Sequence, residues 1–425
     1  MSSDRQVVPI GELGRVVTGK TPSTGKKDYF GGDIPFYTPS DMDGRKFLIQ
    51  TERCLTRLGA DSVKGSIIPA GSVMVSCIGS DMGKVAIAGI EGVSNQQINS
   101  IIVSPSFCHE YIYYELSARK KELKALSAGG SAQPILNKGQ FSRVEVVAPD
   151  LPEQKAIAHI LGTLDDKIEL NRKTNETLEA IAKALFKSWF VDFDPVRAKA
   201  EGRLTGLPAE ISDLFPDSFE DSELGEIPRG WSSSTLGNDF TISMGQSPPG
   251  ETYNEQGIGL PFYQGRTDFG FRFPSKRVYC SAPTRIGEPG ATLISVRAPV
   301  GSVNRAREVS AIGRGVASIY PKDKGFSFTY YLVQSLGKVF DAYNSEGTVF
   351  GAINRKDMAG IKIPSPPQIV KELFESIISS VDDRILTLSN QIESLTSTRE
   401  VLLPKLISGE LRIPDAEALV AEAGI

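Results

Sequence analysis

Two stretches of this chain carry the same heptad pattern of apolar residues, and the second copy follows the first at a constant offset of 217 residues. Within each copy the seam residues alternate four and three apart for more than four heptads. A repeat of 3.5 residues is typical of helices that pair along a common seam, whereas a helix lying on its own domain follows 3.6. The pattern therefore predicts two long helices, over 151–191 and 365–410. The apolar residues predicted to form the helix seam are Ile157, Leu161, Leu164, Ile168, Leu178, Leu185, Ile378, Val381, Ile385, Leu388, Ile392, Leu395 and Leu402.

Polar residues also lie at or beside the seam. Asn171 and Asn175 occupy seam positions near the middle of the first helix, where a buried polar side chain fixes register at a cost in stability. The acidic pairs at 165–166 and 382–383 lie next to the seam, and we expect them to form a solvated helix face.

The repetition extends to the segments that precede the helices. Ile-Pro-Phe-Tyr at 34–37 returns as Leu-Pro-Phe-Tyr at 260–263, and the tyrosine pair at 113–114 returns at 330–331. In each half, short β-rich runs broken by glycine and proline lead into a helix-like stretch. Because a long internal repeat indicates one structural unit built twice, we expect two similar mixed α/β domains with an internal pseudo-two-fold repeat.

The predicted domain organisation follows from these segments. The connector between the first helix and the second globular domain is short, acidic and proline-rich, so the second domain begins near the end of the first helix. Antiparallel pairing of the two helices meets this requirement and predicts a coiled-coil spacer with one globular domain at each end. Two amphipathic helices that each lie on their own domain remain the alternative. The predicted ranges are 1–150 for the first globular domain, 151–191 for the first helix, 192–230 for the connector, 231–364 for the second globular domain, 365–410 for the second helix and 411–425 for a C-terminal tail.

Charge is distributed with the same two-fold rhythm. The whole chain has a formal net charge of −4, but residues 1–149 hold 17 Lys and Arg against 14 Asp and Glu, and residues 231–363 hold 15 against 10. The acidic excess is confined to 150–230, with 10 against 17, and 364–425, with 5 against 10. Mildly basic domains suit a phosphate backbone, whereas acidic helices suit protein docking.

Several function classes are disfavoured by what the sequence contains. Four scattered cysteines and two histidines spell neither a disulfide framework nor a metal site. No catalytic Ser/His/Asp arrangement or HExxH motif is present, so we expect no catalytic residues. The chain has no apolar run of about 18 residues and no signal-like start, which predicts a soluble, cytoplasmic protein without membrane contact.

One segment matches a nucleotide-binding motif. Residues 14–21, Gly-Arg-Val-Val-Thr-Gly-Lys-Thr, fit the phosphate-loop pattern GxxxxGK[ST]. That loop needs a helix that starts at its lysine, but Pro22 and Gly25 follow within a few residues. The equivalent segment of the second half, ending in Gly245-Gln246-Ser247-Pro248, lacks the lysine and is expected to make the same turn. We therefore interpret Lys20 as a phosphate-backbone contact or a plain surface lysine.

Several segments carry a family resemblance that covers nearly the whole chain. They are Gln154-Lys155 at the start of the first helix, Trp-Phe-Val-Asp-Phe-Asp-Pro-Val-Arg-Ala-Lys at 189–199, Leu-Gly-Glu-Ile-Pro-Arg-Gly-Trp at 224–231 and Leu-Pro-Lys-Leu-Ile-Ser-Gly-Glu-Leu at 403–411. With them the chain resembles the specificity (S) subunits of type I restriction-modification systems. The resemblance implies a non-catalytic, sequence-specific DNA-binding subunit whose globular domains are target recognition domains, each reading half of a bipartite double-stranded site.

The same resemblance implies the partners. Methyltransferase (modification) subunits, two per chain, would dock on the helices, and restriction/translocase subunits would complete the complex. The assembled complex would have adenine-N6 DNA methyltransferase activity and ATP-dependent endonuclease activity. No cofactor would be bound by this chain, since S-adenosylmethionine, ATP and Mg²⁺ would belong to the partner subunits.

Candidate DNA-binding residues are polar and basic side chains in loops at repeat-matched positions, because Arg reads guanine edges and Asn or Gln reads adenine. They are Lys20, Thr38, Ser40, Asp41, Lys84, Asn95, Gln96 and Gln97 in the first domain, and Gln264, Arg266, Arg272, Arg297 and Arg314 in the second. Two other classes stay open: a coiled-coil scaffold protein with two protein-binding heads, and a self-sufficient nuclease or ATPase.

Overall fold

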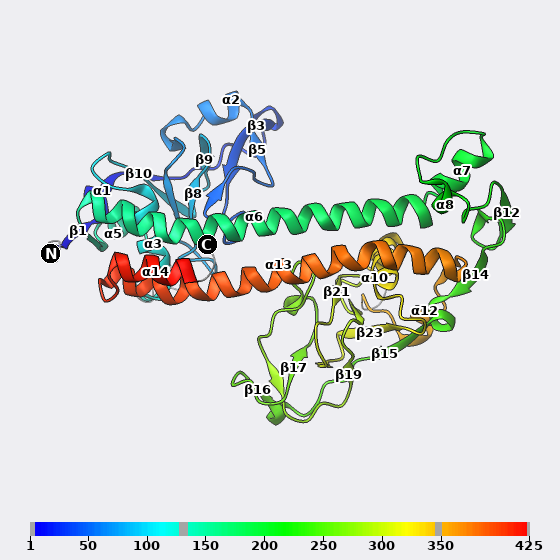
Figure 1. Ribbon diagram of the computed structural model, residues 1–425. Coiled ribbons are helices and arrows are strands. Elements are labelled where there is room, and N and C mark those ends of the chain that lie inside the picture. Colours follow the sequence, from blue (N-terminus) through cyan, green and yellow to red (C-terminus); the bar gives the residue numbers. More distant parts are fainter. Residues whose placement is uncertain (1–4, 127–134, 345–350, 423–425) are drawn as a thin grey trace. The chain divides into compact units, whose positions relative to one another are not determined.

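The computed structural model describes residues 5–126, 135–344 and 351–422 (Figure 1). The chain divides into two compact units. The first unit comprises Met1–Thr174 and Leu388–Ile425, and the second comprises Asn175–Thr387. Each of the two long helices is divided between the units, so each unit contains one globular part and a segment of both helices.

The long helices are α6 (Leu151–Phe190) and α13 (Gln368–Ser408), compared with the predicted ranges 151–191 and 365–410. Helix α13 begins later than predicted because residues before a proline disfavour the helical conformation, and Pro366 and Pro367 precede it. It ends before Gly409, whose φ of 79° is the left-handed conformation that terminates many helices. The predicted tail contains a further helix, α14 (Ile413–Glu422), and its last three residues lie outside the described residues.

Helix pairing is antiparallel in each unit. In the first unit, Asn171 of α6 donates to Gln391 of α13 at 3.2 Å, and Asp165 pairs with Arg399 at 2.5 Å. The contacted residue on α13 therefore lies later in the sequence when the residue on α6 lies earlier. In the second unit, the rings of Phe186 and Phe374 lie 5.6 Å apart. Further along, Glu179 of α6 and Asp382 of α13 bind the same arginine. The antiparallel prediction is confirmed, and every predicted seam residue is buried or half-buried.

The first unit is built around two sheets. One has the strand order β2-β10-β7-β8-β4 and the other the order β5-β3-β9-β6, while β1 pairs with β11 next to the start of α6. The elements are β1 (Gln6–Pro9), α1 (Ile10–Leu13), β2 (Gly14–Thr18), η1 (Lys27–Tyr29), β3 (Phe30–Tyr37), β4 (Phe47–Leu48), β5 (Cys54–Leu55), α2 (Arg57–Asp61), η2 (Lys64–Ser66), β6 (Ile67–Ile68), β7 (Val73–Ser76), β8 (Val85–Ala88), β9 (Gly92–Ser94), β10 (Ile98–Val103), α3 (His109–Ala118), α4 (Lys120–Leu126), α5 (Lys138–Ser142) and β11 (Glu145–Ala148).

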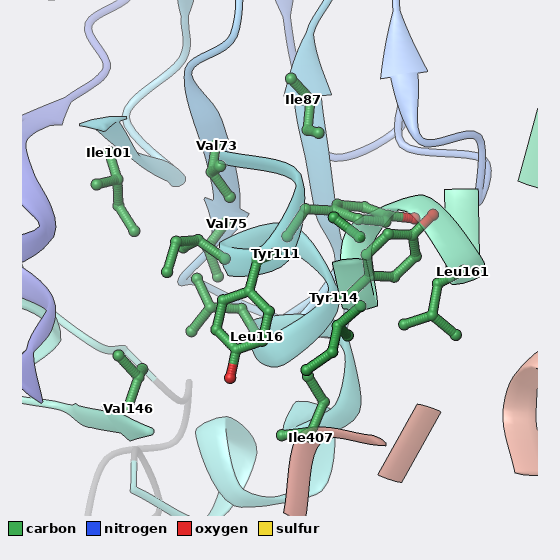
Figure 2. Close-up of a cluster of buried hydrophobic side chains, with 14 of the residues drawn as sticks. Val73, Val75, Ile87, Ile101, Tyr111, Tyr114, Leu116, Val146, Leu161 and Ile407 are labelled. Atoms are coloured by element: carbon green, nitrogen blue, oxygen red, sulfur yellow. The ribbon is translucent and has the colours of Figure 1, made fainter. Parts of the chain in front are cut away.

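One hydrophobic core joins the sheet that contains β7 and β8 to the long helices. Figure 2 shows Val73 and Ile87 of the sheet, Tyr114 of α3, Leu161 of α6 and Ile407 of α13 gathered in a single cluster. Each of these side chains is at most 8% exposed. Burial of a large apolar side chain stabilises a fold by roughly 1.5–3 kcal/mol. The helix segments are therefore part of the first unit's core.

The second unit repeats this plan. Its sheets have the orders β15-β23-β20-β21 and β16-β18-β17-β22-β19, and β14 pairs with β24 as β1 pairs with β11. The elements are α7 (Asp194–Ala200), α8 (Ala209–Ser212), β12 (Phe219–Ser222), β13 (Gly225–Pro228), β14 (Ser232–Thr235), α9 (Leu236–Asp239), β15 (Phe240–Met244), η3 (Gly250–Thr252), β16 (Tyr253–Asn254), β17 (Leu260–Tyr263), η4 (Arg266–Asp268), β18 (Tyr279–Cys280), β19 (Ile286–Gly287), β20 (Thr292–Ser295), β21 (Val303–Arg305), β22 (Ser310–Ile312), β23 (Val316–Pro321), α10 (Phe326–Ser335), α11 (Gly337–Asp341), α12 (Arg355–Ala359) and β24 (Lys362–Ser365).

An aromatic cluster forms the centre of the second unit's core. Phe190 of α6 packs edge-to-face on Phe328 at 5.1 Å and on Phe374 at 5.3 Å. Trp189 lies 5.1 Å from Phe215, which belongs to the predicted connector. The connector is thus packed into the second unit rather than being a free linker. Together, the two units confirm the predicted mixed α/β class and the internal pseudo-two-fold repeat.

No helix within the described ranges is both long and apolar enough to cross a membrane.

Candidate nucleic-acid interface

The phosphate-loop-like segment of the first unit forms a tight turn after strand β2. The Gly19 N–H donates to Ile98 O at 3.0 Å and the Lys20 N–H to Ser94 O at 2.8 Å. A Cβ atom on Gly19 would lie 2.0 Å from Asn95 O, so the close approach of two backbones requires glycine here. The chain after Lys20 is irregular rather than helical, so a phosphate-binding loop is not formed. The Lys20 side chain is exposed.

The second unit makes the same turn without the lysine. The Gly245 N–H donates to Val316 O at 2.9 Å and the Gln246 N–H to Ile312 O at 3.0 Å. A Cβ atom on Gly245 would lie 2.2 Å from Gly313 O. The glycine of this motif is therefore explained by backbone packing in both units, as the sequence comparison of the two halves predicts.

A second loop, between β9 and β10, presents residues 95–97. The Asn95 amide oxygen accepts from the Gln97 N–H at 3.0 Å, and its amide nitrogen donates to Gln97 Oε1 at 2.9 Å. Asn95 is buried, so it shapes the loop. Gln96 at the tip is exposed, and Thr21 donates to its Oε1 at 2.6 Å.

Residues 38–41 form the neighbouring loop, because the Asn95 N–H donates to Tyr37 O at 2.9 Å. Asp41 accepts from the Thr38 N–H at 2.8 Å and from the Thr38 hydroxyl at 2.6 Å, which closes the loop. Ser40 is exposed, and its hydroxyl lies 2.7 Å from that of Thr38. Lys84 donates to Pro39 O at 3.0 Å and pairs with Asp81 at 2.9 Å. The structure thus brings these first-unit candidates to one group of neighbouring loops.

In the second unit, four of the five candidates line one cavity of about 640 Å³. They are Gln264, Arg266, Arg297 and Arg314, and all four are exposed. Among the described residues that line the cavity, three are arginines and none is a carboxylate. Guanidinium groups bind phosphate and guanine edges in a planar, bidentate manner. Tyr253 and Ser247 also line the cavity and were missed. Ser247 follows the turn that the repeat aligns with Lys20, which was the available signal for it, whereas no sequence pattern assigns Tyr253 to the cavity.

Backbone contacts hold these loops together. The Gly313 N–H donates to Tyr263 O at 2.8 Å, which places Gln264 beside the loop that carries Arg314. The Val296 N–H donates to Gly315 O at 2.9 Å, which brings Arg297 to the same place. Asp268 fixes the remaining loop by accepting from the Gln264 N–H at 2.8 Å.

The structure contradicts the prediction made for Arg272. Its side chain is 1% exposed and forms ion pairs with Glu179 of α6 and Asp382 of α13. Its guanidinium carbon lies 3.8 Å from the centre of the Tyr330 ring, and it donates to the Tyr331 hydroxyl at 2.7 Å. The predicted DNA contact by Arg272 is wrong, because this side chain attaches the globular part of the second unit to both helices.

The acidic residues beside the seam also differ from expectation. Asp165 and Asp382 are buried rather than solvated, while Asp166 and Asp383 are exposed. Asp165 accepts from the Tyr114 hydroxyl at 2.6 Å and from Arg399 at 2.5 Å. Burial, reinforced by the Asp165 charge, raises the pKa of Tyr114 well above its ordinary value.

Comparisons with known proteins agree with the fold. The family described as "Type I restriction modification DNA specificity domain" matches residues 2–180. A putative type I restriction enzyme MjaX specificity subunit from Methanocaldococcus jannaschii is 32% identical over 81% of this chain and 79% of its own length. The MjaIX specificity subunit of the same organism is 29% identical over 97% of this chain and 94% of its own length. The crystal structure of a type I restriction-modification S subunit from M. genitalium is similar in fold, with a TM-score of 0.57 and 17% identity over 95% of this chain and 96% of that one.

Proposed function

The chain belongs to the family of type I restriction-modification DNA specificity subunits, and we propose that each of its two units reads one half of a bipartite double-stranded DNA target. The reading surfaces are the loops around Gln96 in the first unit and the arginine-lined cavity in the second. Ser40, Lys20 and Gln97 extend the first surface, and Gln264, Arg266 and Arg297 the second.

The observation that carries this proposal is that one chain contains two copies of the same loop arrangement with different side chains at the tips. Two equivalent backbone hydrogen bonds link these loops in both copies. The turn glycine donates to the first residue of β10 or β23, and the residue that follows β9 or β22 donates to the tyrosine of the Pro-Phe-Tyr motif. Two such surfaces on one chain suit a DNA site with two unlike halves. Positive side chains position the phosphate backbone, while amide and guanidinium groups distinguish base edges.

We further propose that the long helices dock methyltransferase subunits, two per chain, and that restriction/translocase subunits join them. Support comes from charge, because residues 364–425, which contain α13, hold 5 Lys and Arg against 10 Asp and Glu and so disfavour DNA. In this proposal the complex methylates adenine at N6 and cleaves DNA with ATP. S-adenosylmethionine, ATP and Mg²⁺ are bound by those partners, and this chain contributes sequence recognition without catalysis.

Co-purification from the native host tests the partners. A tagged full chain is expected to bring down a methyltransferase at two copies per chain. The same preparation is then offered duplex DNA with a randomised sequence over a range of salt concentrations. We expect one bipartite sequence to be enriched, with an affinity that falls steeply as salt rises. A chain that retains protein partners but enriches no sequence and shows no salt-dependent DNA binding is the scaffold protein of the alternative interpretation.

A further inference from the structure

The two units present different side chains at one structurally equivalent position. Strand β9 of the first unit and β22 of the second hold the same place in their sheets, since each pairs in parallel with the strand carrying the Pro-Phe-Tyr motif. The three residues that follow are Asn95-Gln96-Gln97 in the first unit and Gly313-Arg314-Gly315 in the second.

Three hydrogen bonds establish the equivalence of these loops. The first residue of each triplet donates its N–H to the tyrosine of the motif, at 2.9 Å for Asn95 and 2.8 Å for Gly313. The carbonyl of the third residue accepts from the residue that directly follows β7 or β20: the Cys77 N–H donates to Gln97 O at 2.7 Å, and the Val296 N–H donates to Gly315 O at 2.9 Å. The first residue also accepts from the residue after the triplet, at 3.1 Å in the first unit and 2.9 Å in the second. Gln96 and Arg314 therefore occupy the same position on the same backbone.

The middle residue of each triplet is exposed, while the first and third residues form the backbone hydrogen bonds that hold the loop. Asn95 is buried in the first unit, and Gly313 and Gly315 are buried in the second. Gln96 is oriented by the Thr21 hydroxyl, which donates to its Oε1 and leaves the amide N–H₂ free of that bond. Arg314 lines the cavity shared with Arg266 and Arg297. In each unit, then, the middle residue is the member of the triplet that is presented to solvent.

We propose that Gln96 and Arg314 are equivalent base-reading residues, with Gln96 selecting adenine in one half-site and Arg314 selecting guanine in the other. This inference rests on the proposed function and adds which residue reads which base. A glutamine amide can donate to adenine N7 and accept from its N6 amino group, whereas a guanidinium donates to guanine O6 and N7. The two half-sites therefore differ at the base that corresponds to this one position.

Exchange of the two side chains tests the proposal in the full chain assembled with its methyltransferase partners. Parent, Gln96→Arg and Arg314→Gln complexes are each offered duplex DNA with both half-sites randomised, and the bound DNA is sequenced. Gln96→Arg is expected to change one base of one half-site from adenine to guanine. Arg314→Gln is expected to make the reverse change in the other half-site. A good bidentate contact discriminates by about 5- to 150-fold, so each preference should shift by at least several-fold.

Control variants separate base reading from charge. Gln6→Arg adds the same charge at an exposed position on β1, and Arg355→Gln removes one at an exposed position on α12. Neither is expected to alter any base preference. Gln96→Ala and Arg314→Ala remove the contact without adding a new one, and each should relax selection at its single base while the other half-site stays unchanged. The unchanged half-site reports that the complex remains folded.

Two results overturn the inference. If the variants bind DNA with both half-sites unchanged, these residues read no base. If affinity falls uniformly for all sequences, they contact phosphate. A parent complex that enriches no sequence at all contradicts the proposed function itself, and is distinguishable from both.

Discussion

Arg399 of α13 and Asp165 of α6 form an ion pair at 2.5 Å within the first unit, and the Asp165 carboxylate also accepts from the Tyr114 hydroxyl. The side chains are 22% and 9% exposed, so water screens this pair poorly. The contact joins the two long helices to the helix α3 that lies against the sheet.

Removal of the cation should destabilise the first unit. Arg399→Met keeps the apolar stem but leaves Asp165 buried without its cation, and loss of one partner of such a pair costs about 3 kcal/mol. Chemical denaturation should show the loss, whereas Arg384→Met at an exposed site of α13 should change stability by less than about 0.5 kcal/mol. Arg399→Met combined with Asp165→Asn should recover most of the loss, because the neutral amide removes the unpaired charge and still accepts from the Tyr114 hydroxyl. A double variant as unstable as the single one would contradict this account.

Stability should fall as pH rises towards neutrality because of one buried acid. Burial raises the pKa of Glu115 in α3 to about 7. The unfolded value is about 4.3, so the folded chain holds the proton more tightly and loses stability between these two pH values. Glu115→Gln should therefore be more stable than the parent by about 3–4 kcal/mol at pH 8 and equal to it at pH 4. Denaturation curves at a series of pH values measure the difference, and parallel curves for the two proteins would exclude Glu115 as the cause.

Replacement of a polar seam residue by an apolar one should increase the stability of the first unit. Asn171 is buried and donates to Gln391, which is itself exposed and can bind water instead. Asn171→Leu should raise the free energy of unfolding by about 1 kcal/mol, since an apolar residue replaces a buried amide in the seam. Lys173→Leu, at an exposed position of the same helix, should give no such gain. A lower melting temperature for Asn171→Leu would show that the amide pair itself stabilises the unit.

The N-terminal half should associate with itself through α6, because both halves carry one complete seam. The repeat offset of 217 residues makes Ala182 the counterpart of Arg399. In the fragment dimer, Asp165 of one copy would therefore face Ala182 of the other copy and would lack its cation. A fragment of residues 1–215 should therefore dimerise weakly, and Ala182→Arg should tighten the dimer by at least about tenfold, as one restored charge pair of ~1.4 kcal/mol implies. Sedimentation measures both dimers. Equal dissociation constants would contradict the role assigned to Arg399.

Lys20 should act on DNA through charge alone. Lys20→Ala is expected to weaken binding to all sequences alike and to reduce the slope of log affinity against log salt by about one. Binding of ATP to the isolated chain should be undetectable by calorimetry in both proteins. An altered base preference, or ATP binding that the substitution abolishes, would reject this interpretation.

Periodic features of the fold were predictable, and features that depend on distant partners were not. The seam from Ile157 to Leu402 follows from a 3.5-residue repeat, which the sequence carries directly. Arg272 was assigned to DNA because arginine reads guanine, but its burial depends on Glu179 and Asp382, which are far away in the sequence. The cavity in the second unit likewise requires loops that follow different strands to meet, so Tyr253 could not be assigned to it. Helix α14 is short, and no sustained periodicity identifies it.

The division of the chain into units sets an order of folding during synthesis. The second unit is one continuous segment, Asn175–Thr387, whereas the first needs both Met1–Thr174 and Leu388–Ile425. Since domains fold as they emerge from the ribosome, the unit that is synthesised first lacks its last segment until residues 388–425 have been made. The core in Figure 2 stays incomplete during that time, because Ile407 contributes to it. The second unit can be completed earlier although it is synthesised later, and loss of residues 388–425 is expected to destabilise the globular part formed by the start of the chain.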